Sequence, residues 1–246
     1  MKKFLLLFVI VGSGLMVAAQ SFEGIVTMTP DFKTKPDKKM VFYFKGDQVA
    51  LEQTEGGPMN GKMVGNRKTK DYYVLIESEG KKIALNINMD QLKGMVPGKD
   101  TDATEPAAHP DAHPVKPTIH ETGATRMIDG YSARQILTEM DGNKSEMWVT
   151  KDVDLSIADM SLGAMSGSQF KDYEGIKGMV LEEWDYDADG KINSSVKMTP
   201  EKKPIDDKMF VIPEDYVKMD IMQMIQAAQG DPEMRQEMME IFGSKK

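Results

Sequence analysis

The stretch from Ile128 to Asp152, IDGYSARQILTEMDGNKSEMWVTKD, decides the fold. It contains Asp129-Gly130 and Asp141-Gly142-Asn143, and residues of these types supply the positive φ that tight turns require. The stretch therefore predicts a β-hairpin whose strands run from Tyr131 to Met140 and from Ser145 to Thr150.

Neither strand of this hairpin has a fully polar side. In the first strand Ala133 and Leu137 point to one face, and Ile136 and Met140 point to the other. In the second strand Trp148 and its neighbour Met147 point to opposite faces. Because successive side chains of a strand alternate between faces, both faces of the sheet should meet apolar groups.

Other short apolar runs, separated by Gly, Asp, Asn and Pro, extend this pattern along the chain. Residues 72–76, YYVLI, show no alternation, so that strand should be covered on both faces or line an apolar hollow. The expected strands are Phe22–Thr29, Met40–Lys45, Gln48–Gln53, Lys62–Val64, Asp71–Glu77, Lys82–Met89, Ile176–Trp184, Lys191–Thr199 and Met209–Pro213.

Three segments depart from the strand pattern. Pro97 to Thr118 is rich in proline and poor in apolar residues, which predicts a flexible linker inside the domain. The run from Asp154 to Phe170 is mixed, and its first part has a helical stripe. Glu214 to Gln229 carries apolar residues at helical spacing, and a second amphipathic helix follows Gly230, so residues 214–242 predict a Met-rich helical tail.

The first residues predict export. Lys2 and Lys3 precede an apolar run that is too short to cross a bilayer, and small residues end at Ala19. We expect cleavage there, which leaves residues 20–246 as one exported domain, periplasmic or secreted, soluble and without an integral membrane segment.

Composition excludes several classes of function. The chain has no Cys, which removes thiol catalysis, Cys-ligated zinc and disulfides. The formal net charge is −8, so the chain repels nucleic-acid phosphates, and no nucleic-acid partner is expected.

Two kinds of metal site can be considered. Asp185, Asp187 and Asp189, followed by Gly190, match the first half of an EF-hand loop, but Val196 stands where the closing Glu is needed. A hairpin turn is the simpler interpretation, and the three carboxylates are weak candidates for calcium. His109 and His113, in the Pro-rich segment, lack the spacing that would bring two ligands together.

Methionine is abundant, at 22 of 246 residues. Thioethers on the tail helices could bind Cu(I), or they could be the apolar stripe that docks those helices on the sheet.

Catalytic constellations are not evident. All three histidines lie in or beside the Pro-rich segment, and no Gly-x-Ser-x-Gly turn or phosphate-binding glycine loop is present. Glu182 and Glu183 are the nearest candidates for paired carboxylates, although an exposed strand face explains them more simply. We therefore expect a protein that is not an enzyme and needs no cofactor.

The hairpin also carries a family resemblance. Residues 128–134, IDGYSAR, and residues 146–152, EMWVTKD, resemble an uncharacterised exported bacterial family, domain of unknown function 4412, as do FEGIV at 22–26, the strands about Gly46-Asp47 and MFVIPEDY at 209–216. The family is similar in strand plan to periplasmic lipoprotein carriers of the LolA/LppX type. That resemblance implies a half-barrel around an apolar hollow, without implying lipoprotein transport.

The sequence thus predicts a mainly β (α+β) fold, in which a curved antiparallel sheet or half-barrel has C-terminal amphipathic helices packed on its concave face. The leading functional hypothesis is binding of an apolar or amphiphilic ligand, such as a lipid or a lipoprotein acyl chain. The alternatives are a structural or partner-binding envelope protein that uses the sheet edge or the tail, and copper handling. The expected walls of the hollow are Tyr72, Val74, Ile76, Leu137, Met147, Trp148, Met219 and Met222.

Overall fold

The computed structural model describes residues 21–32, 39–53, 61–78, 80–88, 118–140, 142–156, 176–187 and 189–230. The described strands form one twelve-stranded sheet with the order β12-β6-β5-β4-β3-β2-β1-β11-β10-β9-β8-β7. They are β1 (Gly24–Phe32), β2 (Met40–Lys45), β3 (Gln48–Gln53), β4 (Gly61–Asn66), β5 (Asp71–Ser78), β6 (Lys81–Asn88), β7 (Thr118–Ile128), β8 (Tyr131–Met140), β9 (Asn143–Thr150), β10 (Met179–Tyr186), β11 (Ile192–Lys202) and β12 (Val217–Asp220).

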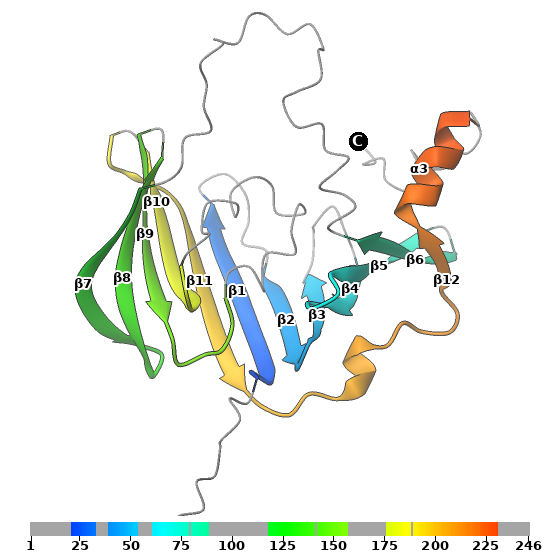
Figure 1. The fold of residues 1–246 in the computed structure, drawn as a ribbon, viewed down its shortest axis with the longest axis horizontal. Coiled ribbons are helices and arrows are strands. Elements are labelled where there is room, and N and C mark those ends of the chain that lie inside the picture. The colour runs from blue at the N-terminus through cyan, green and yellow to red at the C-terminus, as the bar shows by residue number, and fades with distance from the viewer. Residues whose placement is uncertain are drawn as a thin grey trace, which may run out of the picture.

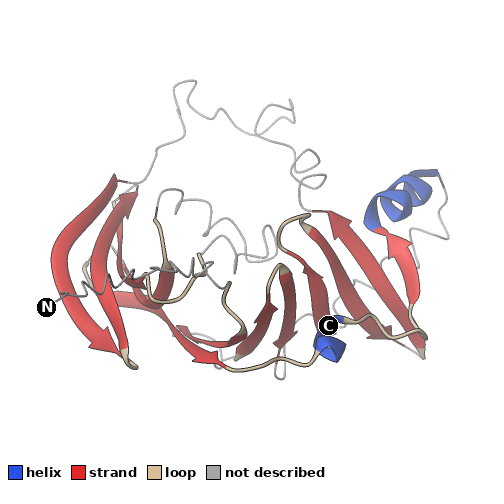
Figure 2. Ribbon diagram, turned by 60° about the horizontal axis from the view of Figure 1, so that its bottom comes forward, coloured by secondary structure: helices blue, strands red, loops and turns tan. Residues whose placement is uncertain are grey.

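The sheet is open and strongly curved, with β7 and β12 at its two ends (Figures 1 and 2). Neighbouring strands pair antiparallel except for β12, which runs parallel to β6. The expected class, mainly β and built on one curved sheet, is confirmed, but the sheet is mixed and not purely antiparallel.

The hairpin that organises the sequence forms as predicted. Asp129 and Gly130 have φ of 49° and 87°, and Gly142 has φ of 79°, so the turns at both ends of β8 use left-handed backbone. Two consecutive positive φ values suit the right-handed twist of the flanking strands. These turns fix the register of β7, β8 and β9.

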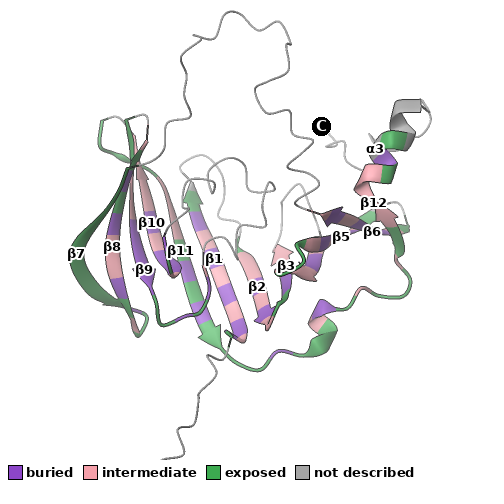
Figure 3. Ribbon diagram, viewed as in Figure 1, coloured by how far each residue is buried: buried purple, intermediate pink, exposed green. Residues whose placement is uncertain are grey.

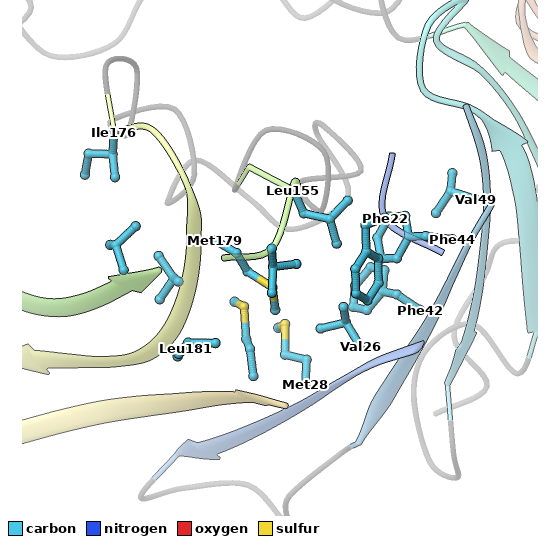
Figure 4. Packing of buried hydrophobic residues seen from close by; sticks show 14 of the residues in the cluster. Phe22, Val26, Met28, Phe42, Phe44, Val49, Leu155, Ile176, Met179 and Leu181 are labelled. Atoms are coloured by element: carbon cyan, nitrogen blue, oxygen red, sulfur yellow. The ribbon is translucent and has the colours of Figure 1, made fainter. Parts of the chain in front are cut away.

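The main core lies on the inner, concave side of the sheet. Buried side chains from β1, β2 and β10 converge there, together with Leu155 from the segment that follows β9 (Figure 4). Phe42 and Phe44 stack with ring centroids 6.2 Å apart, and Phe22 meets Phe44 edge to face. Burial alternates along the central strands, as a sheet with one core-facing side requires (Figure 3).

A second, smaller core lies on the outer face. Residues 203–216, which we call the strap, leave β11 and cross that face to reach β12 (Figure 1). Ile205 and Phe210 of the strap are buried against Ala50 and Val64. Polar contacts hold both ends, since Lys45 Nζ lies 2.7 Å from an Asp207 carboxylate oxygen, and Lys82 Nζ lies 2.7 Å from Asp215.

The strand predicted for Met209–Pro213 is wrong. Its first residues belong to a short 3-10 helix, η3 (Asp207–Phe210). The Asp206 carboxylate accepts a hydrogen bond from the Lys208 backbone N–H and caps the helix. Phe210 turns into the outer core, so this segment packs on the sheet and does not join it.

The helix predicted from Glu214 to Gln229 is partly wrong. Val217–Asp220 is strand β12, and helix α3 (Ile221–Gly230) begins only after it. The Asp220 carboxylate accepts hydrogen bonds from the backbone N–H groups of Met222 and Gln223, which marks the helix start. The edge of β6 offers unpaired backbone groups that a strand can satisfy and a helix cannot.

Helix α3, the one α-helix among the described residues, lies at the β12 end of the sheet and does not cover its concave face (Figure 1). Met224 anchors it in the main core. Strand β7, which includes Thr118 from the end of the expected linker, was not predicted. The expected signal peptide, the linker before Thr118, most of the mixed segment from Asp154 to Phe170 and the second tail helix lie outside the described residues.

Candidate functional site

The inner face carries a continuous row of apolar side chains that runs across the strands. Strand register sets each residue of the row opposite the next, so that all of them share the inner face. We call this the inner-face row; its members are Pro200, Val26, Phe42, Leu51, Met63, Val74, Leu85 and Met219.

The row is long and narrow. It crosses β11, β1, β2, β3, β4, β5, β6 and β12, and neighbouring strands lie about 4.8 Å apart, so seven intervals give about 34 Å. That length is comparable to the hydrocarbon core of a bilayer, about 30 Å. Leu51 and Met219 are half-buried, whereas Val26, Phe42 and Leu85 are nearly inaccessible to water.

Two residues of the segment after β9 cover part of the inner face. Val153 and Leu155 are buried in the main core, and Leu155 points toward Phe42 and Phe44 (Figure 4). Both residues lie in the stretch that directly follows β9.

Five of the eight residues predicted as hollow walls lie on or beside this inner face. Tyr72, Val74 and Ile76 share the inner side of β5, and all three belong to or pack against the main core. Met147 is fully buried on the inner side of β9, and Met219 ends the row.

Leu137 and Trp148 lie on the opposite face from Met147. Strand register places Leu137 opposite Glu146, and Gln135 opposite Trp148. Leu137 is 38% exposed. Met222 lies in the first turn of α3 and is half-buried. The structure therefore does not bring these three side chains to the wall that the other five form.

Trp148 is buried and in contact with the main core cluster, but strand register places its side chain on the outer face of β7 to β10, among polar groups. The Arg126 guanidinium lies 4.1 Å from the Trp148 ring centroid and 5.3 Å from that of Trp184, and it donates a hydrogen bond to Glu182. The Glu146 carboxylate accepts hydrogen bonds from Gln135, Trp148 and Tyr186. Burial, together with the charge of Glu146, raises the pKa of Tyr186.

Glu182 and Glu183, considered as a carboxylate pair, point to opposite faces. Glu182 pairs with Arg126 on the outer face. Glu183 is buried on the inner face, where its register partners are Met147 and Val196. The two carboxylates therefore cannot act together on one bound molecule.

The aspartates of the EF-hand-like turn are engaged by the hairpin between β10 and β11. Asp185 accepts hydrogen bonds from the hydroxyls of Ser145 and Ser194, at 2.7 and 2.6 Å. One oxygen of Asp187 accepts from the backbone N–H groups of Asp189 and Lys191. Within the ranges that the structure covers, no three His, Cys, Asp or Glu side chains are grouped so as to hold a metal ion.

The described methionines of the tail lie at the sheet end. Met224 is buried in the main core, and Met219 packs against it. Met234, Met238 and Met239 lie outside the described residues, so copper binding by this tail stays a prediction.

Sequence reasoning missed a polar depression of about 740 Å³ on the outer face, bordered by the strap, β12 and the start of α3. Asn86 is one of its lining residues. The signal was present in the alternation along β6, because Asn86 and Asn88 share the side opposite Leu85 and Ile87.

Taken together, the described elements define a mainly β protein built on one large open sheet. None of the helices in the described ranges is both long enough and apolar enough to cross a membrane. The chain belongs to the family described as domain of unknown function (DUF4412), whose model matches residues 22–216. This confirms the resemblance found in the sequence. No curated protein sequence gives a significant match.

Similar solved structures match the chain at low identity. A structure of PNGF-II in space group C2 is 15% identical with a TM-score of 0.43, and the match covers 82% of this chain but 32% of PNGF-II. An uncharacterized conserved protein from Thermus thermophilus is 9% identical with a TM-score of 0.44, and the match covers 80% of this chain and 91% of that protein. LolA superfamily protein NE2245 from Nitrosomonas europaea is 14% identical with a TM-score of 0.29, and the match covers 79% of this chain and 91% of NE2245. The chain thus spans about a third of PNGF-II.

Proposed function

We propose that this protein is an exported, non-enzymatic binding protein that holds an elongated apolar or amphiphilic ligand, such as a lipid acyl chain, along its inner face. The observation that carries the proposal is the inner-face row, in which apolar side chains stand in register across eight strands. A row about 34 Å long fits a linear hydrocarbon better than a compact ring system.

The chemistry of the row sets the expected selectivity. Its side chains offer no charge and no hydrogen-bond donor, so affinity should come from burial of methylene groups and not from recognition of a headgroup. Met63 and Met219 are unbranched and polarisable, and such side chains adapt to ligands of different shape. We therefore expect tolerance of acyl chain type with a strong dependence on chain length.

A length series of fatty acids tests this directly. Each added CH₂ that the row buries contributes about 0.8 kcal/mol, so affinity should rise about fourfold per methylene. Displacement of a dansyl-labelled fatty acid by laurate, myristate and palmitate, followed by fluorescence, measures the trend. Affinity that does not change with chain length would contradict the proposal.

A matched pair of variants places the ligand. Leu51→Lys puts a charge in the middle of the row at a half-buried position, where the long lysine stem can carry the ammonium group to water. Ile192→Lys puts the same charge at a residue that is 47% exposed and outside the core. The first variant should weaken fatty-acid binding at least tenfold and the second should not. Equal effects would show that the inner-face row does not bind the fatty acid.

The sheet edge favours one alternative, a partner-binding envelope protein. Strand β7 ends the sheet, and ten of its eleven residues are exposed. An exposed edge can add a strand from another chain. Strand addition would pair the backbone groups of Thr118–Ile128 that face away from β8, so hydrogen exchange at those amides should slow when a partner is bound. Copper handling remains the second alternative and is tested by Cu(I) titration of the full chain.

A further inference from the structure

The polar depression on the outer face has the composition of a ligand site. It measures about 740 Å³, within the range of about 300–1,000 Å³ that small-molecule sites occupy. Its lining side chains from β3 to β6 lie on the opposite side of the sheet from the inner-face row, and Met219 is the one lining residue that also belongs to that row. The inference therefore does not depend on the function proposed for the inner face. Its hydrogen-bonding lining consists of Gln48, Asn66, Asp71, Tyr73, Asn86, Lys218, Asp220 and Gln223.

Strand register builds the floor of the depression. Gln48 stands opposite Asn66, and Asn66 stands opposite Asp71, which makes one polar row across β3, β4 and β5. Tyr73 and Asn86 are partners in the adjacent row, which continues to Asp220 on β12. The polar groups are thus carried by paired strands and keep fixed spacings.

Three of the lining side chains are held in place by their own hydrogen bonds. Asn66 Oδ1 accepts from the backbone N–H groups of Lys68 and Thr69, at 2.9 and 3.0 Å. Asp71 Oδ1 accepts from Asn88 Nδ2 at 2.6 Å. Asp220 Oδ1 caps α3. In each case the second polar atom of the group, Asn66 Nδ2 or the Oδ2 of an aspartate, has no hydrogen-bond partner among the described residues and can bond a ligand.

Three further lining residues carry primary amides that make no side-chain hydrogen bond to any described part of the chain. They are Gln48, Asn86 and Gln223, from β3, β6 and α3. A primary amide offers two donors and one carbonyl acceptor, so neighbouring hydroxyl groups can donate to it and accept from it at once. Three such amides around one depression match a ligand with many hydroxyls.

The remaining walls supply apolar contact. The strap places Phe210 and Ile212 beside the floor, and both pack with Tyr73 in the outer core. Lys218 Nζ lies 5.9 Å from the Tyr73 ring centroid, and this lysine is exposed. Aromatic and aliphatic surface beside amides suits a ring with polar edges and an apolar C–H face.

Charge narrows the ligand class. Asp71 and Asp220 carry two negative charges, and Lys218 carries the only positive charge among the described lining residues. Phosphate and carboxylate groups are therefore repelled at this site. We propose that the outer-face depression binds a neutral saccharide, with the three amides and the two aspartate Oδ2 atoms bonding its hydroxyls and Tyr73 contacting one sugar face.

Saturation-transfer NMR and calorimetry with defined probes test this inference on the full chain. The probes are the neutral trisaccharides chitotriose, cellotriose, maltotriose and mannotriose, with a sulfated trisaccharide for comparison. At least one neutral probe should bind, and more tightly than the sulfated one. Binding by none, or tighter binding of the sulfated probe, would overturn the proposal.

Variants then locate the site. Gln48→Ala removes an exposed amide of the lining, and Gln53→Ala removes an amide from the inner side of the same strand. Gln48→Ala should weaken binding about tenfold, and Asn86→Leu, which keeps the side-chain volume, should act similarly, while Gln53→Ala has no effect. If Gln48→Ala and Asn86→Leu leave binding intact while fatty-acid binding is unaltered, the saccharide site fails and the inner-face function stands.

Discussion

Individual glycines show how closely the strands approach each other. Gly178, just before β10, has φ of 113°, and a Cβ added there would lie 2.3 Å from the backbone oxygen of Thr150. Gly142, in the β8–β9 turn, also has positive φ, but a Cβ there would meet nothing within 4 Å. Both positions strain an L-residue, and only Gly178 adds a collision with backbone.

Alanine at these two positions should therefore lower the unfolding free energy by different amounts. Gly142→Ala should cost about 1–2 kcal/mol of unfolding free energy for the left-handed backbone alone. Gly178→Ala should cost about 3 kcal/mol or more, because β9 and β10 must move apart as well. Urea denaturation followed by circular dichroism measures both, and equal losses would show that β9 and β10 do not pack this closely.

Tyr43 gives a pH dependence on the outer face. Burial, with a hydrogen bond from its hydroxyl to the Glu52 carboxylate, raises the pKa of Tyr43 from 10.0 to about 12. Since the folded pKa exceeds the unfolded one, this stabilisation is fully present below pH 10 and is lost as pH rises through 10 toward 12. Tyr43→Phe should flatten that decline in denaturation midpoints; an unchanged slope would remove Tyr43 as its source.

The alternation of residues along the strands predicted only part of the candidate site. Alternation placed Met147 and Trp148 on opposite faces, yet ligand chemistry alone suggested that both would line one hollow. Register shows that they cannot, because Trp148 shares its face with Glu146 and Gln135. The amides of the outer depression come from strands far apart in sequence, and only the folded sheet brings Gln48 near Asn86.

Among the elements, the strap makes the sharpest stability prediction. Phe210 is the larger of its two buried side chains and packs with Ala50 and Val64, whereas the next residue, Val211, is 57% exposed. Phe210→Ala should cost about 3 kcal/mol through lost burial and the cavity left behind. Val211→Ala should change stability by less than about 0.5 kcal/mol. Thermal unfolding of the two variants checks the contrast, and similar midpoints would mean that the strap is not docked on the sheet.

The strap and β12 also show which elements could not be predicted from local sequence patterns. Local patterns identified the hairpins correctly, because turn residues such as Gly130 and Gly142 act over a few positions. The apolar residues from Val217 onward fit a helical period, but tertiary pairing with β6 converts the first of them into a strand. Strand β7 was missed because TIHETGATRMI has little apolar alternation and, apart from Ile128, is exposed.

For the whole molecule, the sheet order could not be read from the sequence. The central pairing joins β1 to β11, and it brings Met28 opposite Met198 across more than half of the chain. Such contacts depend on the curvature of the complete sheet and not on any local signal. The fold class followed from many short strands and the covered hairpin, whereas the continuous inner-face row emerges only once the order is known.

The central claim, that the inner face holds an acyl ligand, is tested most directly by extracting lipid from the purified full chain and identifying it by mass spectrometry. After incubation with phospholipid vesicles, the natural chain should retain acyl lipid at near one per molecule and Ile192→Lys should match it. Leu51→Lys, or Met219→Lys at the end of the row if the former folds poorly, should retain far less. Lipid-free protein in every case, or equal retention by the inner-face variants, would contradict the account.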